Sequence, residues 1–180
     1  LYTNKHMTPF EMAGLTVEVQ APIMVFREWH RHRTQSFNEM SGRYTVLPDL
    51  YYLPSVERMQ QSAQDNINKQ GSQLGFPLDA AHLWQREIED HYETTRELYE
   101  SMLKAGIARE VARLVLPVSQ YSRMRASANL RNWLGFLTLR MDPAAQWEIR
   151  QYANALAGVL ETHFPRTMAL FKEGAEWRNV

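Results

Sequence analysis

The 180-residue sequence contains no cysteine, carries no net charge and has no long apolar run. Without cysteine it has no disulfide, no thiolate metal site and no cysteine nucleophile, which favours a reducing, cytoplasmic setting. Zero net charge argues against a polyanion partner that is attracted by the overall charge of the chain. A membrane-spanning helix needs about 20 apolar residues, and no apolar run approaches this length. With 44% hydrophobic residues, the chain is long enough for a single domain with a substantial core.

Several motifs of nucleotide and hydrolase chemistry are also missing. The chain has neither a Gly-x-Gly-x-x-Gly fingerprint nor a Gly-x-x-x-x-Gly-Lys-Ser/Thr loop, so any nucleotide is bound by other means. Ser36 and Ser41 lie near His32 and are candidate nucleophiles. However, no Gly-x-Ser-x-Gly elbow surrounds them, which favours hydrogen bonding to phosphate or backbone. His30 and His32 form a His-x-His pair, but residues two apart on a helix point to different sides, so no metal site is predicted.

The most informative feature that is present is a basic segment, residues 31–44, with the sequence RHRTQSFNEMSGRY. Together with Arg27 and Glu28 just upstream, it carries four fixed positive charges and two carboxylates. Guanidinium groups bind phosphate in a bidentate geometry, and small residues let the backbone approach a ligand closely. Because the charge of the whole chain is balanced, the basic segment predicts a site for a small anion.

Three further arginines stand in partly apolar surroundings, at Arg113, Arg131 and Arg140. Arg131 follows Asn129 at a predicted junction between a strand and a helix. A lone arginine usually has a solvated stem or a structural ion pair, whereas a buried arginine needs an anionic partner. Both a structural and a functional role therefore stay open for these three residues. The tryptophans, by contrast, are predicted to be core residues: Trp84, Trp133 and Trp147.

The periodicity of apolar residues predicts a helix-rich chain with few strands. Alternation predicts strands at 15–19 and 121–128, with a loop and a short extended piece over 36–54. Polar residues 65–77 are expected to form a surface segment. Helical spacing bounded by proline and glycine predicts helices at residues 22–33, 79–105 (with Asp79 as N-cap), 107–116, 130–140, 143–164 and after 165.

Four short segments, in this order along the chain, form a pattern that is specific to one family. The central segment is Arg31-His32-Arg33 followed by seven residues and Ser41, with Gly42-Arg43-Tyr44 continuing it. The other three are residues 6–11 (HMTPFE), 109–117 (REVARLVLP) and 146–149 (QWEI). Together they cover most of the chain, and on them the sequence resembles the flavin-dependent thymidylate synthases.

The resemblance implies a helix-rich α+β fold, one domain with a small, mainly antiparallel sheet. It also implies a homotetramer whose active sites are shared between subunits and which converts dUMP to dTMP. The one-carbon donor would be 5,10-methylenetetrahydrofolate, and NADPH would reduce a bound FAD. Because these residues include no cysteine, flavin would take over the part that a cysteine nucleophile plays in classical synthases. Relatives have a segment ahead of the position of His6, so the chain is expected to lack an N-terminal segment.

By position in the matching motifs, the resemblance implies two sets of site residues. The set expected to bind FAD is Thr8, Arg31, His32, Arg33, Glu39, Asn129, Arg131 and Gly135. The set expected to bind dUMP is Glu28, Arg31, Glu39, Met40, Ser41, Gly42, Arg43, Arg113 and Arg140. Guanidinium forks of Arg43 and Arg113 are expected to hold the phosphate. Arg140 is expected to be catalytic, because its permanent charge would stabilise the uracil ionised at N3.

Two other classes of protein stay open at this point. A non-catalytic nucleotide-binding regulator would bind the nucleotide without flavin, and a nucleic-acid-binding module would show a steep salt dependence. The sequence also departs from its relatives at three positions. Met12 stands where they often carry a histidine, and Gly135 and Ala144 lack side chains that some relatives place near flavin or folate.

Overall fold

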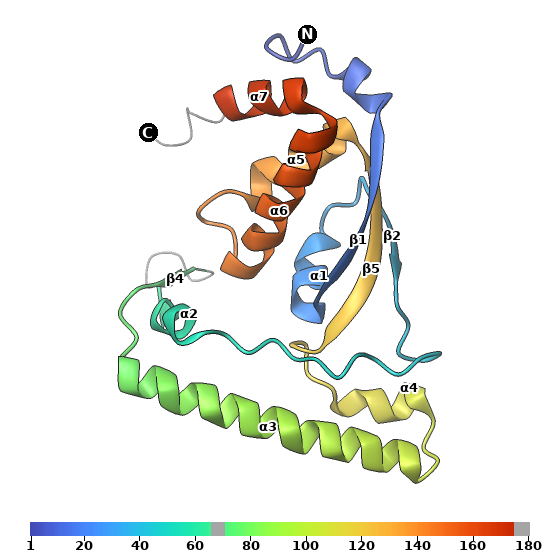
Figure 1. Ribbon diagram of the computed structural model, residues 1–180, viewed down its shortest axis with the longest axis vertical. Helices are drawn as coiled ribbons and strands as arrows, with labels where there is room; N and C mark the ends of the chain where they lie inside the picture. Colours follow the sequence, from blue (N-terminus) through green and yellow to red (C-terminus); the bar gives the residue numbers. More distant parts are fainter. Residues whose placement is uncertain (66–70, 175–180) are drawn as a thin grey trace. The chain divides into compact units, whose positions relative to one another are not determined.

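The computed structural model describes residues 1–65 and 71–174 (Figure 1). The chain forms two compact units, and the prediction of a single domain stays a prediction. The first unit comprises Leu1–Glu18, Glu28–Asn38 and Arg125–Val180, and the second comprises Val19–Arg27 and Glu39–Met124. Part of the predicted surface segment, residues 66–70, lies outside the described residues.

Three strands form the main sheet, in the order β1-β5-β2. Their bounds are Gly14–Pro22 for β1, Ser36–Glu39 for β2 and Tyr121–Asn129 for β5. Burial alternates along β1 and β5, as the period-2 pattern predicts. The sheet is antiparallel, so the α+β class is confirmed. Strand β2 differs from the expected loop, because its sequence Ser-Phe-Asn-Glu has one apolar residue and no readable alternation.

Helix α1 spans Ile23–Trp29 and ends four residues earlier than the sequence predicts. After Trp29 the chain continues through i,i+3 turns, in which the His32 nitrogen donates to the Trp29 carbonyl at 3.0 Å. The Trp29 Nε1 donates to Gln35 Oε1 at 2.9 Å, and this buried bond folds the segment back on the helix end. Arg31, His32 and Arg33 therefore lie in turns and not on the helix.

The first unit has its core among three helices, α5 (Leu130–Arg140), α6 (Trp147–His163) and α7 (Pro165–Glu173). Helix α6 packs against both α5 and α7 (Figure 1). Trp29 stacks on Phe136 with ring centroids 4.6 Å apart, and Trp133 meets both rings edge-on. The predicted helix over 130–140 is confirmed. Helix α6 begins later than Pro143, because the Asp142 carboxylate accepts from the Ala144 nitrogen at 2.8 Å in a preceding turn.

The second unit is built along the long helix α3, Leu78–Lys104. Three short helices belong to the same unit: α2 (Val56–Gln60), α4 (Arg109–Ala112) and the 3-10 helix η2 (Arg113–Val115), all of which contact α3. Two-residue strands β3 (Ala63–Gln64) and β4 (Ser72–Gln73) pair antiparallel. Helix α3 is confirmed, but its N-cap is Pro77 and Asp79 lies in its first turn.

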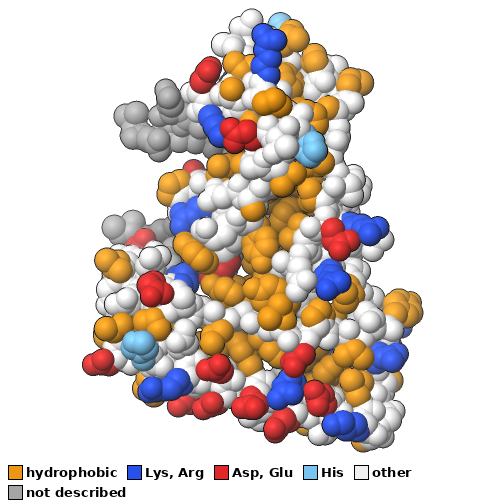
Figure 2. Space-filling view, viewed as in Figure 1, with side chains coloured by type: hydrophobic (Ala, Val, Ile, Leu, Met, Phe, Trp, Pro, Cys, Tyr) orange, Lys and Arg blue, Asp and Glu red, His pale blue; other side chains and the backbone are white. Residues whose placement is uncertain are grey.

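Charged side chains cover the outer face of α3 (Figure 2). Arg96 lies within 4 Å of both Glu93 and Glu100, pairs that contribute little at an exposed surface. Trp84 on this helix is 52% exposed, so the prediction that it belongs to the core is wrong. No helix in residues 1–65 and 71–174 is long and apolar enough to cross a membrane.

The segment after the basic segment is held to the start of β5 by one buried glutamine. Tyr51 and Gln120 form an antiparallel bridge, and the Gln120 amide donates to the carbonyls of Pro48 and Leu50. Gln120 is fully buried, so these bonds satisfy a polar group that would otherwise be costly. They fix the backbone on the C-terminal side of Leu47.

Candidate functional site

The first group of predicted site residues surrounds Arg140, the last residue of α5, in the first unit. Arg140 Nη1 donates to Glu28 Oε2 at 2.9 Å, and Nη2 donates to the Glu28 carbonyl at 3.2 Å. The third bond runs from Arg140 Nε to His32 Nε2 at 2.9 Å. With 17% of its side chain exposed, Arg140 is the more buried partner of this ion pair. The structure thus brings Arg140 together with two predicted residues that lie more than 100 positions earlier in the sequence.

His32 is uncharged in this cluster. Its Nε2 accepts a hydrogen bond from Arg140, so the ring proton must lie on Nδ1. Burial, which is the largest cause, and the positive charge of Arg140 together lower the pKa of His32 from 6.5 to about 4, against an opposing effect of Glu28. The ring also meets Phe136, with centroids 4.8 Å apart. The cluster therefore keeps a neutral ring beside a fixed guanidinium.

The depressed pKa of His32 predicts a loss of stability in mild acid. The unfolded chain binds a proton here below pH 6.5, whereas the folded chain does so only near pH 4. Between these values the unfolded state binds more protons, so the free energy of unfolding falls as the pH drops. Because the ring is only half-buried, we expect His32 to contribute about 1 kcal/mol to this fall.

Urea unfolding at several pH values between 4.5 and 7 measures this contribution, with His32→Asn as the comparison. Asparagine keeps an oxygen that can accept from Arg140 but does not titrate. The variant should therefore lose less stability than the wild type over the same range. Identical pH dependence of the two proteins would contradict the assignment of a neutral His32.

Three residues close to His32 in the sequence, two arginines and a histidine, differ in their contacts. Arg31 and Arg33 are exposed, and their guanidinium groups have no partner in the described parts of the chain. His30 packs against Phe37, with ring centroids 4.8 Å apart. The described residues hold no cluster of three or more His, Cys, Asp or Glu side chains that suits a metal ion.

The remaining residues predicted to bind FAD in this unit lie around the start of α5. Asn129 caps this helix by accepting from the Asn132 nitrogen at 2.9 Å. Arg131 forms an ion pair with Glu11 of the 3-10 helix η1, Thr8–Glu11. Thr8 and Gly135 are exposed, and a Cβ added to Gly135 would meet no described atom within 4 Å. Asn129 and Arg131 therefore have local structural roles, whereas Thr8 and Gly135 lie on the surface.

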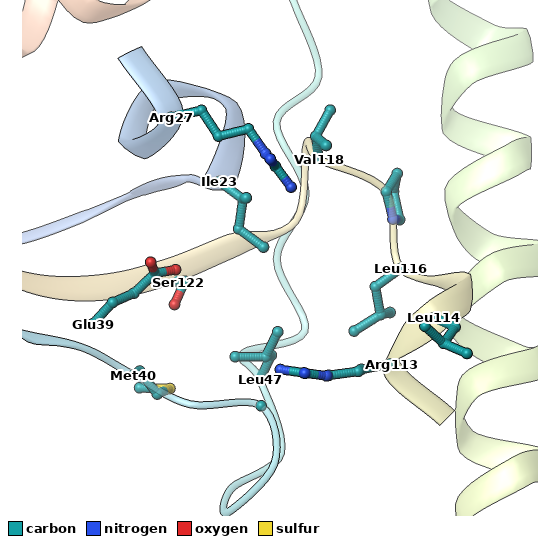
Figure 3. Close-up of a pocket in the computed structure, with 12 residues that line it drawn as sticks. Ile23, Arg27, Glu39, Met40, Leu47, Arg113, Leu114, Leu116, Val118 and Ser122 are labelled. Carbon is teal, nitrogen blue, oxygen red and sulfur yellow. The ribbon is translucent and has the colours of Figure 1, made fainter. Parts of the chain in front are cut away.

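The second group of predicted residues lines a pocket of about 410 Å³ in the second unit (Figure 3). This volume is in the usual range for small-molecule sites. Predicted residues in its wall are Glu39, Met40, Gly42 and Arg113. The rest of the wall consists of Ile23, Arg27, Leu47, Leu114, Leu116, Pro117, Val118 and Ser122. The wall of the pocket therefore combines apolar side chains with charged groups of both signs.

Gly42 lets the stem of Arg113 lie close to the loop. Gly42 is buried, and a Cβ at this position would meet Arg113 Cδ at 3.4 Å and Leu47 Cδ1 at 3.5 Å. Arg113 is exposed, and its side chain extends into the pocket from η2 (Figure 3). Its guanidinium has no partner among residues 1–65 and 71–174, so it is open to a ligand.

Two predicted residues of the basic segment do not line this pocket. Arg43 forms an ion pair with Glu110, with Nη2 to Oε2 at 3.1 Å, and both side chains are about half exposed. The Ser41 hydroxyl accepts from the Arg43 nitrogen at 3.3 Å, a local turn interaction. Their expected roles toward the phosphate stay predictions.

Sequence reasoning named neither Arg27 nor Ser122 as a site residue. Arg27 lies four residues after Ile23, so both fall on one side of α1, and both line the pocket. The sequence did contain a signal for Arg27, because its positive charge lies just before the basic segment. Ser122 is buried in β5 with no hydrogen-bond partner for its hydroxyl among the described residues. A serine in an alternating strand carries no signal of this kind.

Fold and pocket define a helix-rich α+β protein with two arginines in the wall of a pocket of mixed polarity. Residues 1–166 match the family described as "Thymidylate synthase complementing protein". A relative named flavin-dependent thymidylate synthase, from Thermosipho melanesiensis, is 41% identical over 171 residues, which are 95% of this chain and 73% of that protein. The chain therefore belongs to the flavin-dependent thymidylate synthase family.

A second relative shows how much of the family's length the chain spans. A flavin-dependent thymidylate synthase of Thermus thermophilus is 42% identical over 173 residues. The match covers 96% of this chain but only 62% of that protein. The chain thus spans less than two thirds of this relative.

Among solved structures, the chain is similar to the UMP/dUMP methylase PolB from Streptomyces cacaoi bound with 5-Br UMP. The TM-score is 0.86 and the sequence identity 35%, and the match covers 95% of this chain and 79% of that chain. PolB bound with 5-Br dUMP gives a TM-score of 0.83 at the same identity.

Proposed function

We propose that the protein makes dTMP from dUMP, with 5,10-methylenetetrahydrofolate as one-carbon donor and with FAD reduced by NADPH. It acts in this proposal as a homotetramer in the cytoplasm. Family membership supports the reaction class, and the similarity to a UMP/dUMP methylase supports a uridine monophosphate as substrate. The observation that carries the proposal is the pocket of the second unit, whose wall includes four of the predicted dUMP residues.

The bonds of Arg140 support its proposed catalytic role. A guanidinium has five N–H groups, and three of those of Arg140 are used by Glu28 and His32. One N–H on each terminal nitrogen remains to donate to a ligand. Carbon-5 of uracil is a weak nucleophile. A fixed positive charge that favours the uracil ionised at N3 would make this carbon more electron-rich.

The residues of the basic segment fit FAD. Arg31 and Arg33 offer two guanidinium groups that no described residue neutralises, and a pyrophosphate needs such partners. Thr8, Asn129 and Arg131 would provide further contacts. When bound, FAD supplies the reducing equivalents and replaces the cysteine nucleophile that these 180 residues lack. The protein's own part is to orient dUMP, exclude water and hold the charge of Arg140 in place.

Enlarging Gly42 should weaken nucleotide binding. The backbone of Gly42 is not in the left-handed region, so a substitution adds no backbone strain, but the branches of a valine would push on Arg113 and Leu47. We expect Gly42→Val to lower dUMP affinity about tenfold and the free energy of unfolding by about 1–3 kcal/mol. Calorimetric titration and urea unfolding measure the two effects.

Gly42→Ala is the control, because its Cβ would make ordinary contacts at 3.4 and 3.5 Å. It should bind dUMP nearly as the wild type does. If valine at this position left dUMP affinity unchanged, Arg113 would not be a phosphate ligand that depends on this glycine.

Flavin content and nucleotide binding test the proposal against the two other classes of protein. Purified full-length protein should be yellow, with the absorbance band of oxidised flavin, and should bind dUMP and UMP analogues in competition. A nucleotide-binding regulator would bind dUMP without flavin. A nucleic-acid-binding module would bind oligonucleotide with a steep salt dependence, and dUMP would not compete.

A further inference from the structure

Arg27 points into the pocket of the second unit from a different element than Arg113. Figure 3 shows its side chain extending from α1 toward the space that Arg113 enters from η2. Its guanidinium forms no hydrogen bond or ion pair with any described residue. Ile23, one helical turn earlier, lines the same pocket, so the two residues lie on one side of α1.

The charges of the pocket wall leave an excess of one positive charge. Of the twelve lining residues, Arg27 and Arg113 are cationic and Glu39 is the only acidic one. Two guanidinium groups at one pocket repel each other unless an anion lies between them. Both guanidinium groups are exposed, so water weakens this repulsion and the attraction of an anion without removing either.

The neighbouring carboxylate in the sequence does not neutralise Arg27. Glu28, the next residue, directs its carboxylate to Arg140 at 2.9 Å. Arg43, which belongs to the same unit, differs from Arg27 because it is already paired with Glu110. Arg27 is thus a second arginine of the pocket wall whose positive charge is available to a ligand.

We infer that Arg27 is a further binding residue for a phosphate ester in this pocket, acting with Arg113 on the phosphate of the nucleotide. The inference rests on the proposed function for the identity of the nucleotide. Two arginines suit the dianion of a phosphomonoester, which has a second pKa of about 6. The same chemistry would suit the pyrophosphate of FAD, so the experiment must separate the two sources.

Calorimetric titration of the full-length protein with dUMP and with deoxyuridine, at pH 7.5 and 5.5, tests the inference. Arg27→Gln should weaken dUMP binding about tenfold at pH 7.5, the worth of a charged hydrogen bond, and leave deoxyuridine binding unchanged. At pH 5.5, where most dUMP is a monoanion, the deficit should shrink. Arg27→Lys should restore part of the affinity.

The matched control is Arg86→Gln, which removes an exposed arginine of α3 outside the pocket wall. It should bind both ligands as the wild type does. The inference is overturned if Arg27→Gln binds dUMP normally at pH 7.5. It is equally overturned if the variant loses dUMP and deoxyuridine alike at both pH values, or if it loses FAD while its dUMP affinity is unchanged.

Titration with inorganic phosphate separates failure of this inference from failure of the proposed function. A wild-type protein that binds phosphate but not dUMP would refute the proposed function. In that case a lower phosphate affinity in Arg27→Gln than in Arg86→Gln still supports the inference, and equal affinities overturn it.

Discussion

Replacement of Arg140 by alanine is expected to lower kcat for dTMP formation by about 10²–10³-fold, the usual loss when one preorganised electrostatic group is removed. Arg140 is mostly buried and held by Glu28 and His32, so its charge has a fixed position. A fixed charge costs no reorganisation when negative charge develops on the uracil. Alanine removes this charge and leaves the Glu28 carboxylate without its partner.

Steady-state kinetics of the variant, with dTMP measured by chromatography, give the size of the loss. The ratio of flavin absorbance to protein should stay at the wild-type value, because the residues proposed to bind FAD are intact. Loss of the Arg140 charge should also raise the pKa of His32, which the NMR titration of its ring protons would report.

Arg166→Ala is a suitable control, since Arg166 is exposed on α7 and has no partner in the described parts of the chain. It should turn over as the wild type does. Normal turnover of Arg140→Ala would show that Arg140 does not act on the uracil. Loss of flavin together with activity would point instead to a structural role of the cluster.

Replacement of Trp133 by alanine is expected to lower the free energy of unfolding by about 3–5 kcal/mol. Trp133 is fully buried, contacts Trp29 and Phe136 edge-on, and donates from Nε1 to the Leu15 carbonyl at 3.0 Å. Alanine would leave a cavity beneath these rings and an unsatisfied carbonyl in β1. Loss of Trp133 also removes a packing partner of Phe136, against which the His32 ring packs.

Urea unfolding followed by circular dichroism measures the loss, and Trp84→Ala is the matched control. Trp84 is also a helical tryptophan but is half exposed, so its removal should cost less than about 1 kcal/mol. Equal losses in the two variants would contradict the position of the aromatic core in the first unit.

Long, strongly periodic elements could be predicted from the sequence. Strands β1 and β5 have alternating burial, and helices α3 and α5 have apolar residues at helical spacing with clear ends. The end of α1 could not be predicted, because it depends on the bond from Trp29 to Gln35. Helix propensity does not contain such a bond between two side chains. Trp84 was misplaced because amphipathic spacing does not reveal how much of a long helix is covered.

For the candidate site too, the sequence marked residues within a motif but not the contacts between residues that are distant in sequence. The motif around Arg31 to Ser41 marked a site, and resemblance then assigned its residues. Sequence alone could not show that Arg140 bonds His32, 108 residues away, or that Arg43 pairs with Glu110. It also placed Arg27 among the charges of the motif without indicating that its side chain lines the pocket. Such pairings are set by packing of elements that are distant in sequence.

The central claim is that this protein methylates dUMP by a flavin-dependent route. The most direct measurement is dTMP formation by the purified full-length protein from dUMP, 5,10-methylenetetrahydrofolate and NADPH, with and without added FAD. We predict dTMP that requires all three substrates and that is lost when the protein is stripped of flavin and regained when FAD is added. No dTMP from the flavin-loaded protein with all substrates, or undiminished dTMP from the stripped protein, would contradict the claim.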